Sequence, residues 1–155
     1  MFSLGRIGFI PGTFGSLATV IILFICFHVL NLSSNIILLI LLFTFAYSFI
    51  AIKNYTENNE NKDPREIIID EFVGQAIPIY LYEISHGTEK TMDQAVIIYT
   101  VCFILFRFFD ILKPFPVSYF DKKHKNSFGV IMDDVCAGLY VVLVLICFMV
   151  LKSLI

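Results

Sequence analysis

Acidic residues stand in this chain where long apolar runs meet short polar stretches. They occur as two adjacent pairs and two single aspartates, namely Asp70, Glu71, Asp110, Asp121, Asp133 and Asp134. A carboxylate beside hydrocarbon is costly unless a cation or a proton compensates its charge. Hard divalent cations prefer carboxylate oxygens, so several acids placed alike predict the parts of one metal site.

A glycine-rich segment at residues 5–16 leads directly into the first apolar run. Glycines let backbone amides come close to a ligand, and free N–H groups at a helix start attract anions such as phosphate. We expect Gly12, Thr13, Gly15 and Ser16 to contribute to such a phosphate cradle. The alternative is ordinary capping, with Thr13 or Ser16 as the N-cap and the glycines as turn formers.

Two basic residues flank the aspartate at the end of the fourth apolar run. On a helix, Arg107, Asp110 and Lys113 are spaced i, i+3, i+6, which places them along one side near the helix end. The helix dipole disfavours an anion there, so local propensity does not explain Asp110. The alternative is a plain ion ladder. The functional interpretation has Asp110 on a metal ion, with Arg107 and Lys113 facing phosphate oxygens.

The elements that must position these residues are membrane helices. Of the 155 residues, 58% are hydrophobic, the mean hydropathy is +0.84 and Trp is absent, so the chain is too apolar for a soluble domain. The apolar runs span residues 17–30, 36–52, 72–82, 95–109 and 135–151. We expect an all-α, compact membrane bundle of about four to five apolar helices with polar cytoplasmic loops, forming one membrane-embedded domain over 1–155.

The third apolar run, 72–82, is the exception among the five. It is shorter than the about 20 residues that a membrane-spanning helix needs, and Pro78 interrupts it. The sequence therefore leaves three alternatives for this run, which are a kinked helix, a re-entrant segment or a helix buried among the others.

Charge indicates which face of the bundle holds the acids. If the chain starts inside and crosses five times, nine of the eleven basic residues fall in the segments 1–16, 53–71 and 107–134. Such a bias marks the cytoplasmic side of a membrane protein. The same topology places all six acids there. Independent helix caps have no need to be paired acids twice on one side, so the repetition favours a shared site over capping.

Four motifs, in order along almost the whole chain, resemble those of the phosphatidylglycerophosphatase A family of membrane lipid phosphatases. They are Pro11-Gly12-Thr13-x-Gly15-Ser16, Ile69-Asp70-Glu71-x-x-Gly74, Arg107-x-x-Asp110-x-x-Lys113-Pro114-x-Pro116 and Asp133-Asp134-x-x-Ala137-Gly138. The combination is highly specific, whereas no single motif is. In the family a proline commonly stands where Gly8 is, a glycine where Arg65 is, and a Gly-Gly pair where Asn126-Ser127 are.

The resemblance implies a Mg²⁺-dependent enzyme that hydrolyses the phosphate monoester of phosphatidylglycerophosphate to phosphatidylglycerol, in phospholipid biosynthesis at the bacterial inner (plasma) membrane. The implied metal ligands are Asp70, Glu71, Asp110, Asp133 and Asp134. One of these or Asp121 would be the general base. Arg107 and Lys113 would hold the phosphate, with Gly12, Thr13, Gly15 and Ser16 as a second cradle.

Direct attack of water, assisted by Mg²⁺, is the expected route, because the chain has no convincing motif for a phosphorylated enzyme intermediate. The main alternative from another class is a small cation-coupled transporter or channel subunit, since charged groups on membrane helices also mark ion routes. A transport path would thread acids through helix centres, whereas these acids gather on one side.

The expected partners are the phospholipid substrate and membrane lipid. Nucleic acid is not expected, because the chain has no basic stripe. The motifs do not determine the number of metal ions or the oligomeric state.

Overall fold

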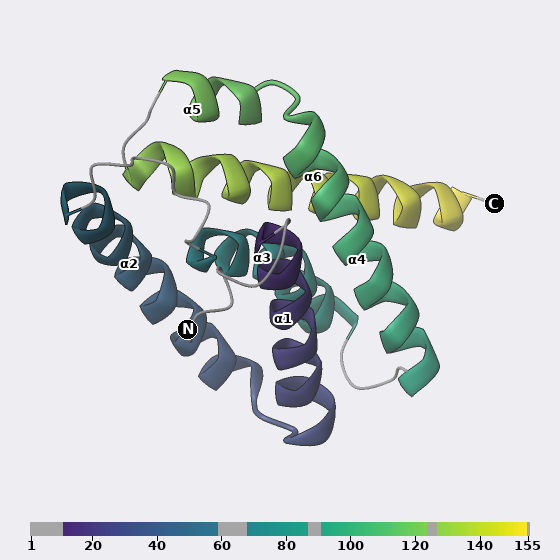
Figure 1. Cartoon of the computed structure of the whole chain (residues 1–155). Helices are drawn as coiled ribbons and strands as arrows, with labels where there is room; N and C mark the ends of the chain where they lie inside the picture. The colour runs from purple at the N-terminus through teal and green to yellow at the C-terminus, as the bar shows by residue number, and fades with distance from the viewer. Residues whose placement is uncertain (1–10, 59–67, 87–90, 124–126, 155) are drawn as a thin grey trace.

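The computed structural model describes residues 11–58, 68–86, 91–123 and 127–154, with side chains omitted for Pro11, 55–58 and 121–123. All regular structure in these ranges is helical, which confirms the all-α expectation. The elements are α1 (Pro11–Phe24), the π-helical η2 (Ile25–Val29), α2 (Ser34–Asn58), α3 (Ile69–His86), α4 (Met92–Leu112), α5 (Val117–Lys123) and α6 (Ser127–Leu154). In Figure 1, α3 lies in the middle of the helical bundle, with α1, α2, α4 and α6 around it.

Four helical segments are long and apolar enough to cross a membrane. They are Gly12–Val29, Ser34–Asn54, Met92–Leu112 and Ser127–Leu154. Their outer faces expose large apolar side chains, such as Phe43 at 74% and Leu39 at 68%. Exposed apolar surface of this extent is suited to lipid rather than to water. The chain is therefore a multi-pass helical membrane protein.

The third apolar run lies in α3, which is the buried helix of the bundle. Half of its 18 residues are buried, including Gln75 and Pro78. A Cβ atom added to Gly74 would lie 2.5 Å from the carbonyl oxygen of Asp134, and one added to Gly138 would meet the carbonyl oxygen of Gly74. The backbones of α3 and α6 are therefore in direct contact. Of the three alternatives for this run, burial among the other helices is confirmed.

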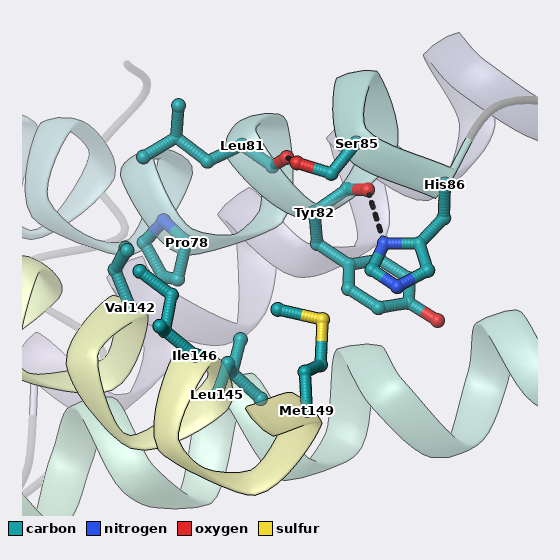
Figure 2. Close-up of a pocket in the computed structure, with 9 residues that line it drawn as sticks. All are labelled: Pro78, Leu81, Tyr82, Ser85, His86, Val142, Leu145, Ile146 and Met149. Atoms are coloured by element: carbon teal, nitrogen blue, oxygen red, sulfur yellow. Dashed lines mark hydrogen bonds between the residues drawn. The ribbon is translucent and has the colours of Figure 1, made fainter. Parts of the chain in front are cut away.

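The half of α3 that lies away from the acids packs through different groups. Glu83 lies 3.4 Å from Nε2 of His28, which joins η2 to α3. On another side, α3 and α6 border a cavity of about 170 Å³, lined by apolar side chains such as Pro78 and Leu145 and by His86 (Figure 2). None of the candidate site residues lines this cavity, so it is not the predicted site.

Candidate functional site

The first pair of acids lies in the first turn of α3, as the sequence predicts. Asp70 is 7% exposed, and its Oδ1 accepts a hydrogen bond of 3.1 Å from the backbone N–H of Glu71. Burial, with the Glu71 carboxylate beside it, raises the pKa of Asp70 well above its usual range. Burial, followed by repulsion from Asp134, raises the pKa of Glu71 to about 8. Both groups therefore require a compensating positive charge to remain ionised.

Helix α1 approaches this pair through its glycines. A Cβ on Gly12 would lie 2.5 Å from Oε1 of Glu71, and one on Gly15 would lie 3.5 Å from Oε2. Thr13 and Ser16 lie inside α1, and Ser16 donates a hydrogen bond of 2.9 Å to the carbonyl oxygen of Gly12. The capping alternative for these two residues is therefore wrong. Their proposed contact with phosphate stays a prediction, and Thr13 is half-buried beside Gly12.

Arg107 connects α4 to α1 at the same end of the bundle. Its Nη1 lies 2.7 Å from Oδ2 of Asp110 and 3.4 Å from the hydroxyl oxygen of Ser16. Its Nε is buried and has no hydrogen-bond partner among the residues that the structure describes. Because Arg107 also lies beside Gly12, a buried cationic donor faces the acids of α3.

Only one of the two ion pairs expected along α4 is present. Arg107 and Asp110 form the expected pair, but α4 ends at Leu112 and Lys113 adopts a left-handed conformation with φ 47°. This turn carries the Lys113 side chain away from α4, and its Nζ lies 3.1 Å from Oδ2 of Asp133 on α6. Lys113 therefore joins two elements instead of completing a ladder on one.

The second pair of acids is not at a helix start. Helix α6 begins at Ser127, so Asp133 and Asp134 lie nearly two turns inside it, and the capping alternative fails for them as well. The hydropathy signal begins only at residue 135, because the first two turns of α6 are less apolar than the rest. The backbone N–H of Asp134 donates a hydrogen bond of 2.9 Å to Oδ1 of Asp133. Asp134 itself is 4% exposed, and its Oδ1 has no hydrogen-bond partner.

The separate segments converge as the sequence predicts. Glu71 is repelled by Asp134 and Asp110 and attracted by Arg107, and Asp134 is repelled by Asp70, so α3, α4 and α6 share one electrostatic site. The start of α1 closes it through Gly12 and Ser16. The Asp121 side chain lies outside the described residues, although its backbone is part of α5.

The chemistry of this donor set fits a divalent cation. Carboxylate oxygens are the ligands that Mg²⁺ prefers. Two of them, Oε2 of Glu71 and Oδ1 of Asp134, are buried and have no hydrogen-bond partner within the described part of the chain. As the side chains stand, no three His, Cys, Asp or Glu residues in the described part of the chain are placed to hold one metal ion. Binding therefore requires some of these carboxylates to turn toward a common point.

Gln75 is a polar residue of this region that sequence reasoning missed. It lies one helical turn after Glu71 on α3 and is fully buried. In the described ranges neither its Oε1 nor its Nε2 has a hydrogen-bond partner. A buried amide without partners is rare in native proteins. The signal that could have found it is its spacing of four from Glu71, inside an otherwise apolar run.

Fold and site together define a class of protein. The chain is a multi-pass helical membrane protein in which buried carboxylates, an arginine and a lysine gather at one end of the bundle, a composition suited to phosphate groups.

The chain belongs to the phosphatidylglycerophosphatase A family. The family model described as phosphatidylglycerophosphatase A matches residues 1–149. The chain is 38% identical over 143 residues to phosphatidylglycerophosphatase A of Haemophilus influenzae, which covers 92% of this chain and 81% of that protein. It is 34% identical over 142 residues to a Bacteroides thetaiotaomicron protein named "Putative phosphatidylinositol-3-phosphatase", covering 90% and 83%. No solved structure matches the chain.

Proposed function

We propose that this protein hydrolyses the phosphate monoester of phosphatidylglycerophosphate and releases phosphatidylglycerol. The single observation that supports this most is the convergence of acids and bases from α3, from α4 with its C-cap Lys113, and from α6 at one end of a membrane bundle. Family membership supports the same reaction. The substrate's acyl chains keep it in the bilayer, so a phosphatase for it needs its polar site at the end of membrane helices.

Phosphate binding is assigned to Arg107 and Lys113. Arg107 has a buried Nε with no hydrogen-bond partner in the described segments, and we assign this donor to a phosphate oxygen. Lys113 has the more accessible side chain, 31% exposed against 14% for Arg107, so it meets an incoming phosphate first. Gly12 and Gly15 leave room between α1 and Glu71, and the proposed second cradle of Thr13 and Ser16 lies along the same turn.

Mg²⁺ is the proposed cofactor, held by ligands drawn from Asp70, Glu71, Asp110, Asp133 and Asp134. A bound divalent cation would relieve the mutual repulsion of these buried acids. When bound, such an ion neutralises phosphate charge and lowers the pKa of water.

The proposed reaction is an in-line attack of water on the phosphorus, with transfer of the phosphoryl group away from the lipid oxygen. Arg107 and Lys113 stabilise the charge on the phosphate oxygens during this transfer. One of the site carboxylates, or Asp121, takes the proton from the attacking water, and the released glycerol oxygen of the lipid takes up a proton to leave as the hydroxyl of phosphatidylglycerol. Burial of the site in the bundle keeps competing water away from the donors.

We place the protein in the bacterial inner membrane, with the acidic end facing the cytoplasm. The bacterial relatives fit that membrane, and the bias of basic residues in the sequence favours the cytoplasmic side for this end. The location of the site acids at one end and the family membership favour this phosphatase over the cation-coupled transporter. The Bacteroides relative makes a phosphatidylinositol phosphate the second candidate substrate.

The test is phosphate release by the purified protein from a panel of lipid phosphates, in Mg²⁺ and in excess chelator. Phosphatidylglycerophosphate should be turned over at least about tenfold faster than phosphatidylinositol 3-phosphate and phosphatidic acid, and chelator should abolish release. A faster rate on phosphatidylinositol 3-phosphate would favour the second substrate. Full activity in chelator would remove the metal from the mechanism.

A further inference from the structure

An exposed aromatic surface borders the site at the corner between α4, α5 and α6. It consists of Phe115, Tyr119, Phe120 and Phe128. The distances between the centroids of successive rings in this order are 6.3, 5.6 and 6.1 Å. Phe115 is 75% exposed, Phe128 45% and Tyr119 40%, while Phe120 is half-buried and packs against the core. Figure 1 shows α5 lying alongside the first half of α6, so the surface runs from the end of α4 to the start of α6.

Both ends of this aromatic surface lie next to one ion pair of the site. Phe115 is two residues beyond Lys113, and Phe128 is five residues before Asp133, about 7.5 Å along the helix. Lys113 and Asp133 are themselves joined at 3.1 Å. The aromatic surface therefore lies close along the chain to both partners of this ion pair, of which Lys113 is the more exposed.

The exposure of Phe115 belongs to an ordered corner. The hydroxyl of Tyr140 on α6 donates a hydrogen bond of 2.5 Å to the carbonyl oxygen of Phe115. The Tyr140 ring also stacks on Phe109 of α4, with centroids 5.0 Å apart. These contacts hold the backbone in place while the Phe115 ring points away from the core.

Lipid is the occupant that the surroundings favour. The surface continues the lipid-facing side of α4, where Ile111 is 72% and Leu112 60% exposed, and α4 is one of the four candidate spans. Tyr side chains at the ends of membrane helices settle at headgroup depth, where the ring meets lipid and the hydroxyl meets water, and this depth suits Tyr119 with the apolar Phe rings beside it. An exposed apolar patch of this kind marks an interaction site.

We propose that Phe115, Tyr119, Phe120 and Phe128 form a lipid-docking surface that seats the glycerol-ester and upper acyl-chain part of the substrate lipid, so that its phosphate reaches Lys113. This inference rests on the proposed function and adds how the enzyme selects a lipid over a soluble phosphate ester. The surface contributes to binding of the lipid part, while Arg107 and the acids act on the phosphate.

The kinetic test compares two variants whose original rings are equally exposed. Phe115→Ala removes a ring that is 75% exposed, and Phe43→Ala removes one that is 74% exposed on α2. Phe115→Ala should raise KM for long-chain phosphatidylglycerophosphate in bilayers about tenfold, the factor expected from losing part of one ring's transfer free energy. Its kcat/KM for the deacylated, water-soluble analogue, which has the same phosphate and headgroup but no ester or acyl chain, should stay within about twofold of wild type. Phe43→Ala should leave both substrates unaffected.

Two kinetic results would overturn the proposal. One is equal loss by Phe115→Ala on the bilayer substrate and the deacylated analogue, because the ring would then act only by supporting Lys113. The other is identical behaviour of Phe115→Ala and Phe43→Ala.

A fluorescence measurement tests lipid contact without relying on activity. The chain contains no Trp, so Phe115→Trp introduces a single reporter. Its emission should be quenched by lipids brominated near the top of the acyl chain, as that of a Phe43→Trp control on a spanning helix should be. Quenching in the Phe43→Trp variant but not in the Phe115→Trp variant would overturn the proposal and would indicate a water-facing or protein-facing surface. If the wild type released no phosphate from any lipid, the proposed function would fail, and this fluorescence readout would still decide whether the surface contacts lipid.

Discussion

Replacing Asp134 with Asn is expected to reduce phosphate release by at least about 10³-fold, the scale of charge stabilisation that a metal-assisted site provides. The same change should raise the thermal stability of the protein in chelator. Asp134 is 4% exposed and is repelled by Asp70, Asp110 and Asp133, so loss of its charge relieves repulsion when no cation is bound. Turnover assays and thermal unfolding in detergent measure the two effects.

The opposite signs of the two effects separate a functional acid from a structural one. Asp93→Asn is the matched control, because Asp93 is exposed in the first turn of α4, at the end of that helix opposite Asp110. It should change neither turnover nor stability by a measurable amount. A variant Asp134→Asn that loses stability and keeps near-normal turnover would make Asp134 part of the packing and not of the site.

Replacing Gly74 with Ala is expected to lower the free energy of unfolding by about 3 kcal/mol, at the upper end for overpacking. The added Cβ would lie 2.5 Å from the carbonyl oxygen of Asp134 and 2.8 Å from Cε2 of Phe106. The carbonyl belongs to the backbone of α6, so α3 and α6 must separate to accept it. Denaturant titration in detergent micelles would measure the loss, and turnover should fall with it.

Gly12→Ala is the informative comparison for Gly74→Ala. Its Cβ would meet Oε1 of Glu71 at 2.5 Å and Nη1 of Arg107 at 3.1 Å, which are the ends of flexible side chains. Gly12→Ala should therefore keep nearly full stability and lose turnover by displacing those groups. Equal stability of Gly74→Ala and wild type would contradict the close crossing of α3 and α6.

The sequence was sufficient for the fold class, and the membership of the site stays a prediction. Hydropathy located the spanning helices, and the cost of burying a carboxylate beside hydrocarbon identified the acids as a group. It also left burial among the alternatives for residues 72–82, because that run is short and Pro78 interrupts it. These conclusions depend on the residue composition of each segment, which can be read directly from the sequence.

The pairing of charges could not be read in the same way. Lys113 was expected beside Asp110 by helical spacing, but its left-handed backbone directs it to Asp133 instead. The position of Asp133 and Asp134 well inside α6 was also missed, since hydropathy marks where a helix becomes apolar and not where it begins. The short helix α5 was missed too, because seven residues give too little periodicity to detect. Each error concerns geometry set by tertiary contacts.

The central claim is that a bound divalent cation connects the buried acids to the substrate phosphate. Its most direct test replaces Mg²⁺ with Mn²⁺ and measures the ³¹P hyperfine coupling of a non-hydrolysable phosphonate analogue bound to the wild-type protein. We predict a coupling that indicates coordination of a phosphonate oxygen to Mn²⁺, and its loss in Asp134→Asn. A bound analogue without any coupling to Mn²⁺ in the wild type would contradict the claim.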